Sequence, residues 1–104
     1  MENTTPYYSV FDVTPTDDAW IPNYLPVANK LVAQYGGKYL ARTANHEQVE
    51  GETEAVGLRV IIEWPSKAAA LAFMNDSEYA PHFKARTEGS VSNQYLIEGR
   101  DEFA

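Results

Sequence analysis

Hydrophobic and polar residues alternate most regularly between Gly57 and Trp64, and this pattern predicts a β-strand. Side chains of a strand point alternately to its two faces. The residues of the apolar face would be Leu58, Val60, Ile62 and Trp64. Those of the opposite face would be Arg59, Ile61 and Glu63. Stretches rich in aromatic and β-branched residues predict three further strands, at residues 7–13, 38–43 and 91–98.

A different spacing, of three and four residues, follows the first strand and predicts a helix that ends at Tyr35. The residues of its apolar face are Trp20, Tyr24, Val27, Leu31 and Tyr35. Pro26 lies inside this helix, and its missing N–H leaves the carbonyl of Pro22 without a helical partner. The sequence therefore predicts a kink or a break at Pro26.

A second helix is predicted from Lys67 to about Asn75, because Pro65-Ser66 ends the preceding strand and offers a cap. Its inward residues would be Ala69, Ala70 and Phe73. Residues 76–89 predict an irregular or short helical segment, and residues 44–56 a long, acidic hairpin loop.

Gly36 and Gly37 separate the first helix from the second strand. Glycine adopts positive φ without steric cost, and helices often end at such a residue. We expect Gly37 to take this conformation.

The predicted order is strand-helix-strand, twice, which is typical of an α+β, ferredoxin-like βαββαβ domain with a four-stranded antiparallel sheet. Residues 7–99 would form this single domain, with a flexible tail at residues 1–6 and a charged tail at 100–104. Both helices would cover one sheet face. The other face, carrying Arg59, Ile61 and Glu63, would be bare, and it predicts a homodimer that packs sheet on sheet.

Composition narrows the choice of partners. The 104-residue chain has a net charge of −7, which disfavours nucleic acid and anionic membranes. It has no cysteine and no apolar run long enough to cross a bilayer. Its first residues lack the features of a secretory signal. We expect a cytoplasmic protein that binds neither nucleic acid nor membrane.

Arg42 and Arg59 are the first candidate functional residues, because each places a charged side chain among apolar neighbours in a predicted strand. They could clamp an anionic ligand, or form structural ion pairs with Glu63 or another acid. Glu63 lies ~13 Å from Arg59 along the strand, too far for a direct pair. It is a candidate general base, with a structural role as the alternative.

His82 could move a proton near neutral pH and lies at helical spacing from Tyr79 and Arg86. Tyr24, Tyr79 and Trp20 could line a pocket for a flat ligand, or belong to the core. His46 lies in the acidic loop and is expected to be solvated. The two histidines are far apart and no cysteine is present, so no metal site and no cofactor is predicted.

Three runs resemble the DUF1330 family and follow in that family's order: YGGKYLAR at 35–42, RVIIEWPS at 59–66 and SEY at 77–79. The resemblance covers residues 7–99. It implies a ferredoxin-like fold of the dimeric α+β barrel superfamily, and a homodimer. Two departures are Thr43-Ala44, where the family usually has a glycine pair, and Trp64, where it typically has Phe.

The family's activity is unassigned, and the superfamily includes cofactor-free monooxygenases, haem-degrading and haem-binding proteins, and small isomerases. Fold alone therefore leaves the function open. The first hypothesis is a dimeric protein that binds a small aromatic or acidic molecule at Arg42, Arg59, Tyr24 and the 79–86 segment. If it is an enzyme, a cofactor-free oxygenase or isomerase fits best. The alternative is a non-catalytic dimeric ligand-binding or structural module.

Overall fold

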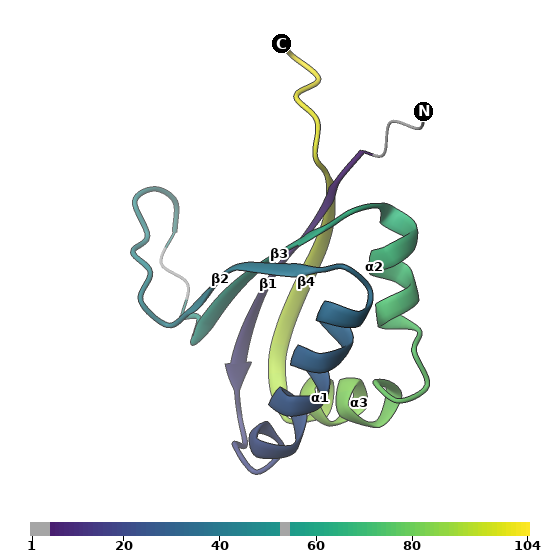
Figure 1. Ribbon diagram of the computed structural model, residues 1–104. Coiled ribbons are helices and arrows are strands. Elements are labelled where there is room, and N and C mark those ends of the chain that lie inside the picture. The colour runs from purple at the N-terminus through teal and green to yellow at the C-terminus, as the bar shows by residue number, and fades with distance from the viewer. Residues whose placement is uncertain (1–4, 53–54) are drawn as a thin grey trace.

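Four strands form one antiparallel sheet in the order β2-β3-β1-β4, and three helices lie against it (Figure 1). The computed structural model describes residues 5–52 and 55–104. The elements are β1 (Tyr7–Pro15), α1 (Ile21–Gln34), β2 (Lys38–Thr43), β3 (Leu58–Trp64), α2 (Lys67–Met74), α3 (Ala80–Glu88) and β4 (Ser90–Glu98).

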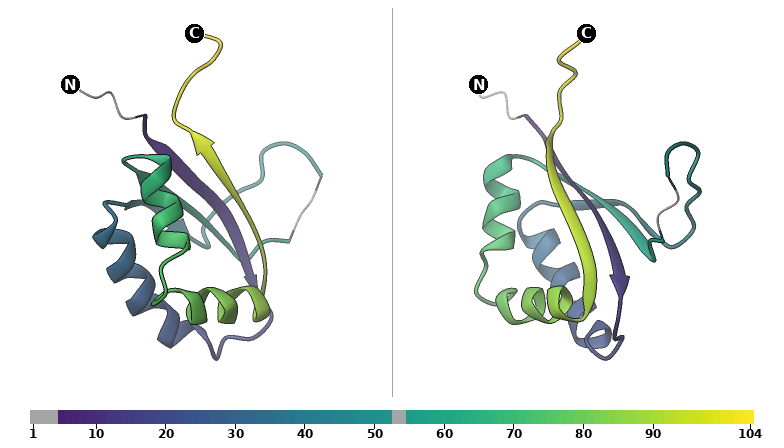
Figure 2. Two further views of the ribbon diagram at one scale, coloured as in Figure 1. Left: turned by 90° about the vertical axis from the view of Figure 1, so that its right-hand side faces the viewer. Right: turned by 180° about the vertical axis from the view of Figure 1, so that it is seen from behind.

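The ferredoxin-like prediction is confirmed, with one addition. The segment predicted to be irregular or briefly helical contains the nine-residue helix α3, so two helices connect β3 to β4. All three helices cover the same face of the sheet, as the views in Figure 2 show. The predicted tail at 1–6 falls mostly on residues 1–4, which lie outside the described residues.

The core lies between this covered face and the helices. Val60, Ile62 and Trp64 of β3 point into it, as their alternation predicted, and Trp64 is only 1% exposed. The indole N–H of Trp64 donates to Ser9 Oγ of β1 at 2.9 Å, so the large aromatic ring has a partner for its polar atom. Ala70 of α2 is fully buried, and this small side chain lets the helix approach the sheet closely.

The helix α1 runs through Pro26 without a break, so of the kink or break predicted there the break is wrong. Pro22 and Pro26 both lie on the exposed side of the helix. The carbonyl of Pro22, which has no amide donor at Pro26, therefore lies on the exposed side of the helix, where water can take the place of the missing amide. Tyr24, Ala28, Leu31 and Val32 are buried on the other side and hold the helix to the sheet.

The turn after α1 corrects another prediction, because the positive φ belongs to Gly36 (79°) and not to Gly37. Gly36 N–H donates to the carbonyl of Ala33, and Gly37 N–H donates to that of Val32. This pair of bonds is the Schellman arrangement, in which the first residue beyond the cap takes the left-handed conformation. Gly37 is needed for a different reason: an added Cβ would lie 2.7 Å from the ring of Trp64.

A β-bulge interrupts the pairing of β2 with β3. Tyr39 lies opposite Ile62, but Arg42 lies opposite Val60, so one extra residue is accommodated between Tyr39 and Ala41. Because Ile62 and Val60 both point into the core, Tyr39 and Arg42 lie on the same, helix-covered side of the sheet.

The sheet face away from the helices, here called the open face, has an apolar centre. Val10 of β1 lies directly opposite Ile61 of β3 on one side and Tyr95 of β4 on the other. Tyr95 is 68% exposed, and Val91 and Ile97 of the same strand are also exposed. No element in the described part of the chain covers this face.

None of the described helices is long and apolar enough to cross a membrane.

Candidate functional site

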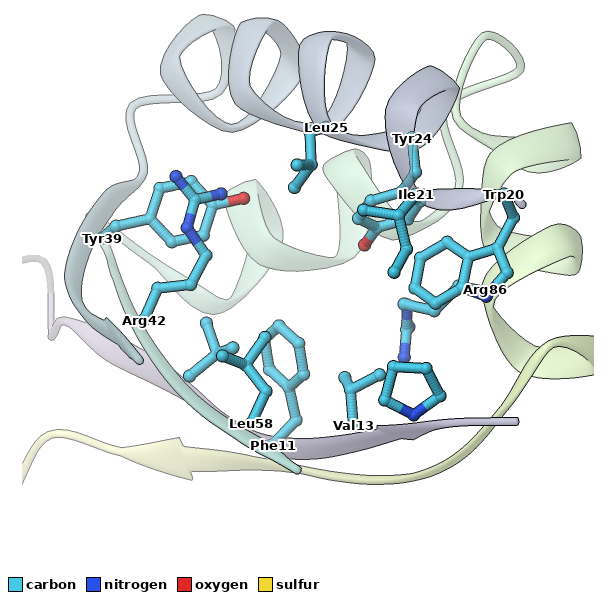
Figure 3. A pocket seen from close by; sticks show the side chains of 12 residues that line it. Phe11, Val13, Trp20, Ile21, Tyr24, Leu25, Tyr39, Arg42, Leu58 and Arg86 are labelled. Atoms are coloured by element: carbon cyan, nitrogen blue, oxygen red, sulfur yellow. The ribbon is translucent and has the colours of Figure 1, made fainter. Parts of the chain in front are cut away.

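A cavity of about 80 Å³ lies between the N-terminal half of α1 and the sheet, and is here called the central pocket (Figure 3). Five elements or their flanks contribute to it. Its lining residues are Phe11, Val13, Pro15, Trp20, Ile21, Tyr24, Leu25, Tyr39, Arg42, Leu58, Val60 and Arg86. The walls are therefore mostly apolar, with a few polar groups, as is typical of small-molecule sites.

Arg86 of α3 is the unusual member of this lining. It is only 3% exposed, and its Nε has no hydrogen-bond partner within residues 5–52 and 55–104. No ion pair found among those residues includes it. Its guanidinium instead lies near aromatic rings, 5.5 Å from the centre of Phe11, 5.9 Å from Tyr24 and 5.3 Å from Phe83.

Cation–π contacts offset only part of the cost of taking a guanidinium out of water. A buried charge is normally paired with an opposite charge and fully hydrogen-bonded. Arg86 therefore provides an uncompensated positive charge at the wall of an apolar pocket.

Tyr24 of α1 and Tyr79, the residue before α3, form a buried pair of phenols whose oxygens lie 2.7 Å apart. Burial is the main cause that raises the pKa of Tyr24 far above its ordinary value, and the nearby Tyr79 adds to it. Tyr24 is thus neutral at physiological pH. Either hydroxyl can be the donor of this bond, so Tyr24 can direct its own proton into the pocket when Tyr79 donates to it.

Arg42 and Tyr39 of β2 form the other end of the pocket. The guanidinium carbon of Arg42 lies 3.8 Å from the centre of the Tyr39 ring, and Arg42 Nη1 donates to Asn29 Oδ1 of α1 at 2.6 Å. The bulge makes this stacking possible, because it brings both side chains to one side of the sheet. Burial raises the pKa of Tyr39, and Arg42 and Arg86 both oppose that rise, so both guanidinium groups act on its phenol.

The charge of the pocket differs from that of the whole protein. The chain carries 15 acidic and 8 basic residues. Among the described residues, the lining of the pocket includes two arginines and no carboxylate. Its polar side chains are hydrogen-bond donors or neutral phenols, an arrangement suited to a ligand with negatively charged oxygen atoms.

The structure brings four of the predicted site residues into the pocket lining: Arg42, Arg86, Tyr24 and Trp20. Tyr79 lies directly behind Tyr24 and contacts it. His82 is half-buried on α3 and is not part of the lining. His46 is exposed in the loop between β2 and β3.

Arg59 and Glu63 lie on the open face, on the other side of the sheet from the pocket. Arg59 is exposed and lies opposite Asp12 of β1, and no ion pair among the described residues includes it. Glu63 accepts a hydrogen bond from the Tyr8 hydroxyl at 3.3 Å. Neither residue can contact a ligand in the central pocket.

Sequence reasoning missed Phe11 and Tyr39 as pocket residues. Phe11 could have been found, since it lies on the same strand face as Ser9 and Val13 once β1 is paired with β3. Tyr39 could not, because strict alternation separates it from Arg42.

Within the described ranges, no three or more His, Asp or Glu side chains are grouped closely enough to hold a metal ion.

A sequence profile described as "Domain of unknown function (DUF1330)" matches residues 6–100. No curated protein matches the chain. Among solved structures, a protein of unknown function from Rhodopseudomonas palustris is similar with a TM-score of 0.78 at 18% identity, covering 95% of this chain and 85% of that one.

SnoaB, a cofactor-independent oxygenase from Streptomyces nogalater, is similar with a TM-score of 0.56 at 18% identity, covering 95% of both chains. A protein of unknown function from Bacteroides thetaiotaomicron, described as a possible oxidoreductase, gives 0.50 at 15% identity and covers 93% of this chain and 99% of that one. At these identities the similarity extends to the fold alone.

Proposed function

Because the chain belongs to the DUF1330 family, whose function is unknown, we propose a role from the site itself: the central pocket binds a small, flat organic acid whose carboxylate pairs with Arg86. The buried and unpaired guanidinium is the observation that carries this proposal. An anion bound there would supply the missing opposite charge and hydrogen-bond acceptors in a region of low dielectric constant, where both are strongest.

The aromatic and aliphatic lining of the pocket supports a flat and largely apolar ligand body. The side chains of Phe11, Ile21 and Leu58 form its walls. The volume of about 80 Å³ is smaller than the ~150 Å³ of a cavity that encloses benzene. The acid group and the adjoining carbons would therefore lie inside, and the remainder would extend past the exposed Leu25 and Arg42.

Thermal unfolding in the presence of benzoate, its neutral analogue benzamide and trans-but-2-enoate tests this proposal. A ligand that binds only the folded protein raises the free energy of unfolding, by ~2.7 kcal/mol at a concentration 100-fold above Kd. We expect the acids to raise the melting temperature and benzamide to have no effect.

Arg86→Met should abolish the response to these acids. Arg59→Met removes the same charge from the open face and is the matched control, which should respond as the wild type does. An equal response of Arg86→Met and the wild type would contradict the proposal.

A second candidate is a cofactor-independent oxygenation of a bound aromatic substrate. Its support is the fold shared with SnoaB together with the aromatic lining of the pocket. His82 and Glu63, the predicted catalytic groups, do not line the pocket, so the substrate would have to enter already ionised. Oxygen uptake by the protein with an electron-rich phenolate tests this candidate, with the Arg86→Met variant as the control.

The homodimer remains part of the proposal, through the open face. Contiguous apolar side chains on β3, β1 and β4, with Ile61, Val10 and Tyr95 at their centre, support it, since exposed patches of this kind mark interfaces. Light scattering at micromolar concentration should give the mass of a dimer. Ile61→Asp should give a monomer, whereas Leu71→Asp on the exposed side of α2 should leave the dimer intact.

A further inference from the structure

From the two arginines of the central pocket, we infer that its ligand is a diacid, with acidic groups at opposite ends of a flat body. Arg86 binds the inner group and Arg42 binds the outer one. This inference rests on the proposed function, because it requires an acid at Arg86, and it adds a second group at the mouth of the pocket.

Arg42 is held in place for such a role. Its guanidinium is fixed from one side by the Tyr39 ring at 3.8 Å and from another by the hydrogen bond to Asn29 Oδ1. Asn29 is neutral, and none of the ion pairs among the described residues includes Arg42. A guanidinium has five N–H donors, so Arg42 keeps donors for a carboxylate, which a guanidinium binds best with two parallel bonds.

The two guanidinium groups approach the cavity from different sides (Figure 3). Arg86 comes from α3, next to Trp20 and Val13, whereas Arg42 comes from β2, next to Tyr39. The apolar side chains of Ile21, Leu25 and Leu58 lie between them and would contact the body of the ligand.

Arg86 is buried and Arg42 is exposed at the mouth, so the pocket holds two positive charges whose mutual repulsion water screens in part. A monoacid neutralises only one of them. A diacid neutralises both and places its hydrocarbon part against the apolar walls, so the same pocket should prefer it to a monoacid of equal size.

Calorimetric titration with two matched pairs of acids tests the inference. The aromatic pair is 4-methylbenzoate and benzene-1,4-dicarboxylate, and the shorter pair is trans-but-2-enoate and trans-butenedioate. In each pair a methyl group replaces the second carboxylate at nearly constant shape. For at least one pair we expect the diacid to bind the wild type about tenfold more tightly or better, as hydrogen bonds between charged groups provide.

Arg42→Met should remove this preference, so that the two members of each pair bind this variant with about the same affinity. Arg42→Lys keeps the charge but loses the planar fork and the stacking on Tyr39, so it should retain a smaller part of the preference. Arg59→Met, which changes the charge equally on the open face, should retain all of it.

The outcomes separate this inference from the proposed function. If the monoacids bind through Arg86 and the diacids bind no better, the diacid inference is overturned and the proposed function stands. The diacid inference is overturned in the same way if Arg42→Met weakens both members of a pair equally. If no acid of either pair binds, the proposed function and this inference are both overturned.

Discussion

On the helix-covered face of the sheet, Trp64 is 1% exposed, whereas on the open face Tyr95 is 68% exposed. Both side chains are large and aromatic, and both lie in regularly alternating strands. The exposed fractions differ because all three helices pack on one side of the sheet (Figure 2). Apolar residues of the covered face therefore stabilise the single chain, and those of the open face are available for association.

The two faces also differ in whether their polar side chains bond within the chain or to water. Among residues 5–52 and 55–104, the buried polar side chains of the covered face have partners within the chain, as in the bond from Trp64 to Ser9, and Arg86 is the exception. On the open face, charged residues such as Arg59 are exposed and hydrated. A charge that is buried without a partner, in a region where other polar groups are paired, is the observation that supports the proposed binding role of Arg86.

Among the variants that test this difference between the two faces, Trp64→Ala is expected to change the free energy of unfolding most. It removes a buried ring and leaves the Ser9 hydroxyl without its donor, so the free energy of unfolding should fall by about 3–5 kcal/mol. Tyr95→Ala on the open face should change it by less than about 1 kcal/mol in dilute protein. Urea unfolding measures both, and similar losses for the two variants would abolish the distinction between the faces.

Gly37→Val should cost about 1–3 kcal/mol, because the new side chain would overlap the Trp64 ring and Val32 on the covered side. The matched control is Lys38→Val, one residue later, at an exposed strand position that tolerates a β-branched residue. An unchanged urea midpoint for Gly37→Val would mean that the close contact with Trp64 is absent in solution.

Arg86→Met should raise the free energy of unfolding of the ligand-free protein by roughly 1 kcal/mol, since it replaces an unpaired buried charge with an apolar side chain of similar length. Arg59→Met, at an exposed position of the open face, should leave it within about 0.5 kcal/mol of the wild type. Thermal unfolding without ligand measures both changes. A marked loss of stability in Arg86→Met would show that the guanidinium supports the fold.

The smallest effect concerns a surface contact between α1 and the turn before α3. The Tyr35 hydroxyl donates to Asp76 Oδ2. This hydrogen bond is the largest of the interactions that hold the pKa of Asp76 below its ordinary value of 3.8. A carboxyl with a lowered folded pKa contributes stability above its unfolded pKa and loses it as the pH falls through the folded value.

Acidification below about pH 4 should therefore destabilise the wild type more than Asp76→Asn. Tyr35→Phe should lie between the two, because the Glu78 N–H still donates to Asp76 Oδ1 in that variant. Melting temperatures across the acid range measure this difference. Parallel curves for all three proteins would mean that the bond contributes nothing to the pH dependence.

The strands and their faces could be predicted because alternation is a local property of the chain. The covered face of β3 and the inward residues of α2 follow directly from spacing. The positive φ at Gly36 could not be assigned, since two adjacent glycines offer the same freedom, and only the hydrogen bonds to Val32 and Ala33 decide between them. The helix continues through Pro26 because its other face is packed on the sheet, and packing is not local information.

The site was predicted less completely than the fold. Arg86 and Tyr24 could be singled out by residue type and helical spacing. The approach of Arg42 to Tyr39 depends on the bulge in β2, which moves the two side chains to the same face and leaves no mark in the sequence. The exclusion of Arg59 and Glu63 from the pocket depends on which face the helices cover.

The positions of the two tryptophans also give the protein two separate optical reporters. Trp20 lines the central pocket, with its indole N–H bonded to the Gly89 carbonyl, and Trp64 lies in the core against Phe73. Light emitted by Trp20 should respond to a molecule entering the pocket, whereas that from Trp64 should change only when the core opens. Trp20→Phe would leave Trp64 as the single tryptophan, so that unfolding can be followed without the signal from the pocket, and the difference from the wild type reports occupancy without an attached dye.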